Sequence, residues 1–299
     1  MSISKRNAKR LPIQTLKKAL VCTWNEAEAW QKENPHLLGH YRTPSYSYRQ
    51  SFASLGYLHN QTSNIYTHLL GAVLFLSWAV EAYNEVLQRY QTSDFFDFLA
   101  FGVFFACALL CFGSSALFHI FANHSVAVNH TWLLFDLYGV FALIVATIFS
   151  GTFYGFYCER EWWLIYSGGI ILISCICAAV CAKSARNQTQ RWRNMRTLLF
   201  IAIGFYGCLP MTHLAQSRGR AKANEMMGWN VMFWEGVSYL VGAAIYGVRI
   251  PERWRPGHFD IWGASHQIFH ICAVVGAALH YRGLIEAFDY SHNPMSRQC

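Results

Sequence analysis

Two histidines four residues apart, His266 and His270, open the last long apolar stretch of the chain. On a helix, this spacing places both imidazoles on one face. Zinc takes four protein ligands in structural sites, or three and a water in catalytic ones. Histidine is costly inside a membrane, so its presence at this place favours a chemical role. The pair therefore predicts half of a metal site whose other ligands come from elsewhere in the chain.

The elements that carry this pair are predicted to cross a membrane. Of the 299 residues, 54% are hydrophobic and only 13% are charged, about half the charge of a soluble domain. The apolar residues fall in long blocks, and a helix needs about 20 such residues to span a bilayer. The seven blocks are 64–88, 96–119, 130–155, 162–182, 196–215, 226–248 and 265–287. They predict an all-α membrane protein with seven transmembrane helices, the fifth kinked at Pro210.

The distribution of charge predicts how the bundle sits in the membrane. The loop between the fourth and fifth blocks is basic and contains no acid. Its basic residues are Lys183, Arg186, Arg191, Arg193 and Arg196. Loops with such an excess remain in the cytoplasm. We therefore expect a cytoplasmic N-terminus and an extracellular or lumenal C-terminus, in the plasma membrane or the endoplasmic reticulum. Because this topology explains the net charge of +8, we expect no nucleic-acid partner.

The remaining sequence divides around the bundle. Residues 1–63 are predicted to form a cytoplasmic N-terminal segment, residues 64–287 the transmembrane domain, and residues 288–299 a short tail. Between residues 13 and 30, apolar side chains recur at spacings of three and four with lysines among them. This pattern predicts an amphipathic helix that ends before Pro35 and packs against the bundle or the lipid interface.

The expected topology brings further polar residues to the histidine pair. With the N-terminus inside, the second helix ends at the cytoplasmic side, where the third and seventh helices begin. His119 closes the second helix and Asp136 lies early in the third. Three histidines with a carboxylate nearby make a catalytic type of zinc site. Asp136 would then deprotonate a water, and Ser115, on the same helical face as His119, would hydrogen-bond the site or an oxyanion.

Simpler interpretations remain open. A single membrane histidine commonly bonds a neighbouring helix, and Asp136 alone could pair with a histidine or cap the third helix. A signalling receptor with a structural zinc site and a transporter or zinc-handling protein are alternative functions. The shared depth of the four residues favours the metal site. A nucleophile made there would face lipid, which suits hydrolysis of a lipid amide or ester.

Several other residues compete for a role. His68 lies near the inner end of the first helix, and His124 and His130 lie in the loop beside His119. Glu235 falls near the middle of the sixth helix, where an acid is a functional candidate by its position. A retinal protein is excluded, because no lysine follows Lys222 to form a Schiff base in the last helix.

These motifs resemble the progestin and adipoQ receptor family, which includes adiponectin receptors and the bacterial haemolysin III proteins. The resemblance covers roughly residues 38–290. It is carried by Leu58-His59-Asn60-Gln61-Thr62, Ser115-Ala116-Leu117-Phe118-His119 with Asp136 after it, Arg249-Ile250-Pro251-Glu252-Arg253, and Ser265-His266-Gln267-Ile268-Phe269-His270. The first of these segments is more similar to the fungal members than to the animal ones.

The resemblance implies a seven-helix membrane bundle with an intracellular N-terminus and zinc as its cofactor. It implies His119, His266 and His270 as zinc ligands, Asp136 as the acid that contacts the zinc-bound water, and Ser115 as the nearby serine. Adiponectin receptors are associated with ceramide hydrolysis, and fungal members with zinc homeostasis and sterol or lipid metabolism. The expected partners are therefore a membrane lipid (ceramide-like, fatty acid or sterol) and an extracellular protein ligand. The expected function is a zinc-dependent lipid amide hydrolase, a receptor, or both.

Two positions depart from the animal receptors. Leu137-Tyr138 follows Asp136 where those receptors have Tyr-Ser, and Glu235 replaces an apolar residue. Neither position is a predicted metal ligand. Both leave open which lipid is the substrate and which ligand activates the protein.

Overall fold

Seven helices are long and apolar enough to cross a membrane in the part of the chain that the computed structural model describes, residues 20–185 and 189–295. The spanning segments are Thr62–Val86, Phe95–Phe121, Val126–Gly155, Arg160–Lys183, Gln190–Arg218, Trp229–Val248 and Ser265–His292. They coincide with the seven apolar blocks, which confirms the all-α class. The last helix continues past residue 287, so part of the expected C-terminal tail is helical.

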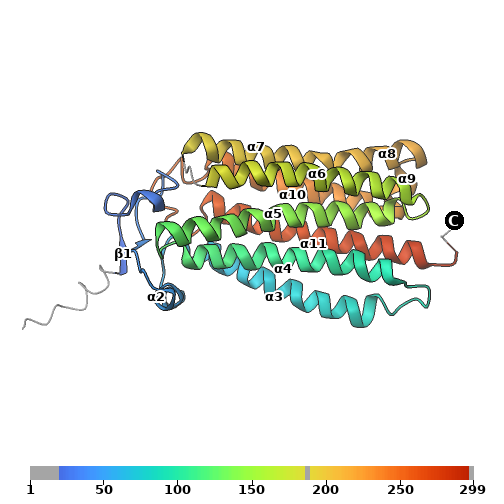
Figure 1. The fold of residues 1–299 in the computed structure, drawn as a ribbon, viewed down its shortest axis with the longest axis horizontal. Helices are drawn as coiled ribbons and strands as arrows, with labels where there is room; N and C mark the ends of the chain where they lie inside the picture. The colour runs from blue at the N-terminus through green and yellow to red at the C-terminus, as the bar shows by residue number, and fades with distance from the viewer. Residues whose placement is uncertain (1–19, 186–188, 296–299) are drawn as a thin grey trace, which may run out of the picture.

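The long helices lie side by side along the length of the molecule (Figure 1). They are α3 (Thr62–Glu81), which ends in a π-helical turn (Ala82–Val86), α4 (Phe95–Phe121), α5 (Val126–Gly155), α6 (Arg160–Ala185), α7 (Gln190–Tyr206), α8 (Cys208–Arg218), α9 (Arg220–Met227), α10 (Trp229–Val248) and α11 (Ser265–His292). Their outward surface exposes large apolar side chains, among them Leu70, Leu164, Leu172 and Leu198, each more than 60% exposed. Such a surface suits contact with lipid.

Polar residues set the ends of these helices. The Asp94 carboxylate accepts hydrogen bonds from the first backbone N–H groups of α4, and the Ser125 hydroxyl does the same for α5. The fifth span is broken at Gly207, between α7 and α8. Pro210 cannot donate to the carbonyl of Tyr206, one helical turn earlier, so the break lies where the sequence predicts a kink.

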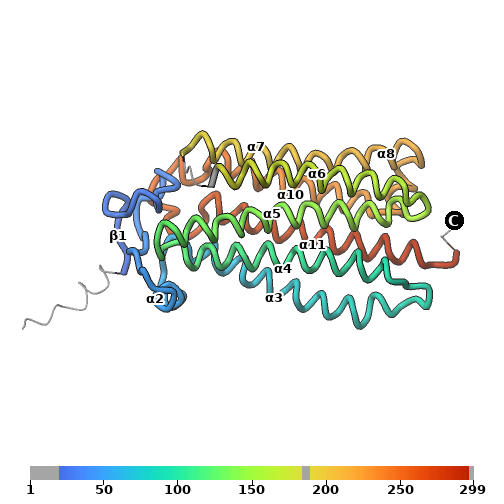
Figure 2. Tube along the Cα trace, in the orientation of Figure 1, coloured from blue at the N-terminus to red at the C-terminus, as the bar shows by residue number. Residues whose placement is uncertain are grey.

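Helix α11 occupies the middle of the bundle. It packs against α3, α5, α9 and α10, and more lightly against α4. In the trace of Figure 2 it runs between α4 and α10 for most of its length. A residue on α11 can therefore meet side chains from several other helices, which is what a site assembled from distant segments requires.

The N-terminal segment covers one end of the bundle. Strands β1 (Val21–Cys22) and β2 (Tyr41–Arg42) pair antiparallel, and the short helix α2 (Tyr48–Ala53) follows, with 3-10 turns at Ala29–Gln31 and Ser54–Gly56. The loop between α10 and α11 lies at the same end, where the Leu38 N–H donates to Asp260 Oδ1 over 2.8 Å. We refer to this end, formed by residues 20–61 and 249–264, as the N-terminal face.

The prediction of an amphipathic helix between residues 13 and 30 is wrong for residues 21–30, which the structure describes. Val21 and Cys22 pair with β2, and a turn follows in which the Glu26 carboxylate accepts the Thr23 N–H over 3.0 Å. Strand pairing and this local cap satisfy the backbone groups that a helix would otherwise use. Residues 13–19 lie outside the described part of the chain.

Candidate metal centre

Three histidines from two helices converge just below the N-terminal face. His119 lies in the last turn of α4, and His266 and His270 lie in the first two turns of α11. The Nε2 atom of His266 is 3.3 Å from that of His119 and 3.2 Å from that of His270. Their ligand atoms form a group within 4.8 Å of one another. The sequence prediction that distant segments bring these three residues together is confirmed.

The spacing of the nitrogens fits a tetrahedral metal ion. Zinc–nitrogen bonds of about 2.0–2.1 Å at tetrahedral angles separate neighbouring nitrogens by about 3.3 Å. The two closest Nε2 separations, 3.2 and 3.3 Å, match that value. Three bare imidazole nitrogens would otherwise repel one another through their lone pairs. The donor set therefore fits zinc, with room in the coordination shell for one further ligand.

Hydrogen bonds on the other ring nitrogens turn the Nε2 lone pairs inward. His119 donates from Nδ1 to Gln61 Oε1 over 2.8 Å, and His270 donates from Nδ1 to the Asn64 carbonyl over 3.2 Å. Both acceptors come from the first turn of α3 or the residue before it. An imidazole that gives its Nδ1 proton to a carbonyl oxygen presents an unprotonated Nε2, the form that binds metal. Gln61 and Asn64 were not predicted from the sequence.

Arg42 fixes the end of α4 that carries His119. Its guanidinium donates to the carbonyls of His119 and Ile120 over 2.5 and 2.8 Å, and to the Ser54 hydroxyl over 2.7 Å. Burial lowers the pKa of Arg42 to about 10, so the side chain is still charged at neutral pH. A positive charge on the last carbonyls of a helix is favourable. Arg42 thus fastens strand β2 beneath the ligand helix.

The start of α11 is held by a buried acid. Glu252 is fully buried and accepts the Ser265 N–H over 2.8 Å, and the Ser265 hydroxyl also donates to it. The Asn34 amide donates to the same carboxylate over 2.8 Å. A carboxylate at a helix N-terminus satisfies free N–H groups and complements the helix dipole. Because His266 follows Ser265 directly, this cap fixes the direction in which both α11 ligands point.

The predicted acid, Asp136, is not a member of the three-histidine group. It is half-buried on α5, and its carboxylate is within electrostatic reach of Ser115 and Cys111 on α4. Ser115 is 1% exposed, and the pair does not have the geometry of a hydrogen bond. Side chains on a helix tilt towards its N-terminus, so His119 on α4 and Asp136 on α5, which run in opposite directions, lean towards each other. The catalytic roles of Asp136 and Ser115 remain predictions.

The close approach of α4 and α5 at this level depends on a glycine. A Cβ added to Gly139, one turn after Asp136, would lie 2.7 Å from Cys111 Cα and 2.7 Å from Ser114 Oγ. Contacts that short are prohibitive, so only glycine lets the two helices pack at this separation. Gly139 thereby sets the distance between Asp136 and the ligand helix.

Glu235, His213 and His124 have partners outside the three-histidine group. Glu235 pairs with His280, whose Nδ1 is 2.9 Å from Glu235 Oε2 and whose Nε2 is 2.9 Å from the Ser150 hydroxyl. His213 Nδ1 is 2.9 Å from the Tyr166 hydroxyl. His124 packs on the ring of Tyr48 with centroids 4.4 Å apart, and neither it nor His130 belongs to the three-histidine group.

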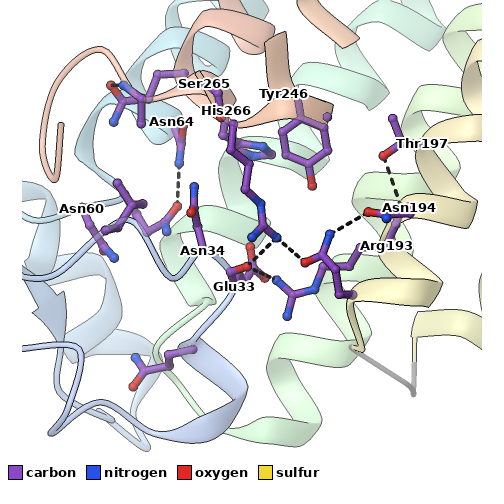
Figure 3. A pocket seen from close by; sticks show the side chains of 18 of the residues that line it. Glu33, Asn34, Asn60, Asn64, Arg193, Asn194, Thr197, Tyr246, Ser265 and His266 are labelled. Carbon is purple, nitrogen blue, oxygen red and sulfur yellow. Dashed lines mark hydrogen bonds between the residues drawn. The ribbon is translucent and has the colours of Figure 1, made fainter. Parts of the chain in front are cut away.

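An opening in the N-terminal face reaches His266. Figure 3 shows His266 at one side of this pocket, with Tyr246 and Asn64 beside it. Arg193 and Arg249, which also line the pocket, both donate to the backbone carbonyl of Glu33. His119 and His270 are each 2% exposed, whereas His266 is only partly buried. The cluster is thus accessible from this face mainly through His266.

Comparisons with known proteins agree with this arrangement. A sequence profile described as "Haemolysin-III related" matches residues 56–281. The chain is 34% identical to the "Adiponectin receptor protein" of Drosophila melanogaster over 90% of its own length and 60% of that protein. It is 30% identical to "ADIPOR-like receptor IZH2" of Saccharomyces cerevisiae over 97% of its own length and 92% of that protein. It is 31% identical to "Heptahelical transmembrane protein 1" of Arabidopsis thaliana, with coverages of 93% and 84%.

Proposed function

The chain belongs to the haemolysin-III related, adiponectin receptor-like family of seven-helix membrane proteins, and from this premise we propose that it is a zinc-dependent hydrolase of lipid amides. The observation that carries the proposal is the convergence of three histidines. The Nε2 atom of His266 lies 3.3 Å from that of His119 and 3.2 Å from that of His270, and His119 and His270 donate from Nδ1 to carbonyl oxygens. Structural zinc sites are closed by four protein ligands, whereas catalytic sites keep a position open. The group here has three histidines among the described residues.

The residues around the cluster divide the chemistry between them. A bound zinc ion supplies Lewis-acid chemistry, which activates water and polarises a carbonyl at neutral pH. Asp136 accepts the proton of the attacking water at its carboxylate and passes it to the amide nitrogen as the carbon–nitrogen bond breaks. Water and amide thus become a fatty acid and an amine. Ser115 orients Asp136 or donates to the oxygen on which negative charge develops.

A second candidate is a signalling receptor whose zinc is structural. It is favoured by the relatives from Drosophila and yeast, which are named as receptors. The open position in the ligand group favours catalysis instead, and an assay with purified protein separates the two.

Substitution of the proposed base tests the hydrolase. Wild-type protein in detergent should hydrolyse at least one member of a panel of N-acyl lipids, and chelation of zinc should abolish this. Asp136→Asn should lower the rate by about 10²-fold or more while zinc content is unchanged. Absence of zinc-dependent hydrolysis by wild-type protein on the whole panel would leave the structural-zinc receptor as the better account.

We also infer that the N-terminal face is cytoplasmic. Arg193 and Arg249 line its pocket, and the buried Arg42 belongs to the same face. An excess of basic residues marks the inner side of a membrane protein. A protease-cleavable tag at the N-terminus should then be cut only after cells are permeabilised, whereas the same tag at the C-terminus should be cut in intact cells. The reverse pattern would refute this orientation.

A further inference from the structure

A buried histidine beside the metal centre has no hydrogen-bond partner for either ring nitrogen. His68, on α3, is 4% exposed, and both Nδ1 and Nε2 are unpartnered among the described residues. Its ring stacks on that of His270, with centroids 3.6 Å apart and planes 8° from parallel, and lies 5.1 Å from the ring of Phe112 on α4. A neutral imidazole offers one donor and one acceptor. Burying both without a partner is unfavourable and unusual in a folded protein.

A buried tyrosine reaches the same part of α4. The hydroxyl of Tyr239, on α10, is enclosed and has no hydrogen-bond partner among residues 20–185 and 189–295, and its ring packs on Gly276 of α11. A Cβ at Gly276 would lie 2.7 Å from the tyrosine ring, so the absent side chain makes room for it. The phenol is within electrostatic reach of Glu235, one turn earlier on α10, and of the Cys111 thiol on α4. Tyr239 and His68 therefore both lie near the α4 turn that contains Cys111 and Phe112.

These groups lie near the part of α4 that precedes His119. The His68 ring contacts Phe112, Tyr239 is within electrostatic reach of Cys111, and Asp136 is within electrostatic reach of Cys111 and Ser115. We refer to His68, Ser115, Asp136 and Tyr239 as the inner polar group. Tyr239 lies deeper than the Nε2 cluster, because it packs on Gly276, which follows His270 along α11, whereas His68 stacks on His270 itself.

The chemistry of the inner polar group selects an uncharged ligand. His68 and Tyr239 can each donate and accept one hydrogen bond, as the amide and hydroxyl groups of a lipid can. None of the described electrostatic partners of His68, Tyr239 or Asp136 is a lysine or arginine. The Asp136 carboxylate opposes a second negative charge nearby. Arg193 and Arg249, which would favour an anion, line the pocket at the N-terminal face.

We propose that His68 and Tyr239 bind the uncharged polar head of the lipid substrate, its amide or adjacent hydroxyl, and so select amide lipids over fatty acids and phospholipids. The inference rests on the proposed function, because it assigns the substrate-binding residues of the same site. The unpartnered nitrogens and hydroxyl are then the groups that the lipid satisfies when it enters from the membrane.

Binding of a lipid that resists hydrolysis tests this assignment. A lipid urea keeps the carbonyl and N–H of the amide, and a fatty acid of the same chain length serves as its anionic counterpart. Wild-type protein should bind the urea at least about tenfold more tightly than the fatty acid. His68→Phe, which keeps a ring to stack on His270, and Tyr239→Phe should each weaken urea binding by about tenfold with zinc content unchanged.

Tyr281→Phe is the matched control. Tyr281 also has a buried, unpartnered hydroxyl, but it lies farther along α11, against Trp78 and Phe105. Its substitution should leave urea binding unchanged. Equal affinity of wild type, His68→Phe and Tyr239→Phe for the urea, or no preference of wild type for the urea over the fatty acid, would overturn the assignment.

Binding and turnover also separate this inference from the proposed hydrolase. If the variants lose urea binding while wild-type protein hydrolyses no lipid, the binding site stands and the hydrolase fails. If wild-type protein hydrolyses amide lipids and the variants bind the urea as wild type does, the hydrolase stands and this binding site fails.

Discussion

The ligand histidines depend on neighbours that hold their second nitrogen. Gln61 accepts from His119, and it also accepts from the Asn64 amide over 2.7 Å, so the two residues that support the ligands support each other. Asn64 supplies its backbone carbonyl to His270. Partners of this kind fix the ring orientation and raise metal affinity. The start of α3 is therefore part of the candidate metal centre although it contributes none of the three histidines.

His59, two residues before Gln61, should make stability depend on pH. It is 1% exposed, and burial, with a smaller effect of Arg42, lowers its pKa to about 2. Its Nδ1 accepts the Gln61 N–H over 3.1 Å, which requires the neutral ring. Once unfolded, the same ring binds a proton below pH ~6.5. Its contribution to stability is thus complete above pH ~6.5 and falls as the pH drops, by about 2 kcal/mol at pH ~5.

Thermal unfolding in detergent at about pH 7.5 and about pH 5 measures this effect. Protonation of the three clustered histidines also lowers the stability of the protein at acidic pH. Comparing wild type with His59→Gln cancels this contribution, because both proteins contain the cluster. The variant should lose less stability than wild type between the two pH values. The same loss in both proteins would show that His59 does not exclude a proton in the folded state.

How far the residues could be predicted depends on where their partners lie. His119, His266 and His270 could be identified because imidazoles at a membrane boundary are rare and topology assigns them to one face. Gln61 and Arg42 could not be identified, because their roles depend on contacts with α4: Gln61 accepts from a histidine ring nitrogen, and Arg42 donates to the last helix carbonyls. Polar residues at the start of a helix usually cap it or face solvent, so the residue type alone did not indicate a contact with a histidine on another helix.

At the scale of helices, the packing of α4 against α5 sets the distance between His119 and Asp136. Gly139→Ala should push the helices apart, since its Cβ would meet the Cys111 backbone at 2.7 Å. We expect a loss of roughly 1–3 kcal/mol of stability and a lower hydrolysis rate, because Asp136 lies one turn away. Gly113→Ala is the control: it lies on α4 with nothing within 4 Å of its Cβ, so it should be neutral or slightly stabilising. Similar melting temperatures and rates for both variants would refute this role of Gly139.

The helices themselves were largely predictable, and the N-terminal segment was not. Seven apolar blocks define the spans, because without water a membrane segment must satisfy its backbone internally. Outside the membrane that constraint is absent. Val21 and Cys22 join a two-stranded pair with residues that follow them by about twenty positions. The spacing of apolar residues cannot reveal a strand partner that far along the chain. It therefore predicted a helix, whereas in the structure these residues pair with β2.

Over the whole molecule, α11 links three polar layers at different depths. His266 and His270 meet His119 at the N-terminal face, and His280 meets Glu235 of α10 farther along. At the opposite end, His292 Nε2 is 3.0 Å from Asp97 Oδ1 of α4, which also accepts from the Tyr154 hydroxyl over 3.0 Å. Buried polar groups in a membrane need partners, so each pair fixes α11 against a different neighbour.

Among the described residues, the acid in the sixth span belongs to a hydrogen-bonded layer and not to the three-histidine group. The Glu235 side chain has His280 as its partner, and His280 bonds Ser150 of α5 with its other nitrogen. All three residues are at most 8% exposed. The three residues join α5, α10 and α11 in the middle of the bundle, whereas the metal centre and its access lie at the N-terminal face. The sequence placed Glu235 in the membrane but could not name its partner, because His280 lies on another helix.

Zinc analysis of purified protein tests the central claim most directly. Wild-type protein should contain about one zinc ion per chain. His266→Ala should lose most of it, whereas His213→Ala, which removes a histidine bonded to Tyr166 instead, should retain it. Wild-type protein without zinc, or the same zinc content in all three proteins, would contradict a metal centre at His119, His266 and His270.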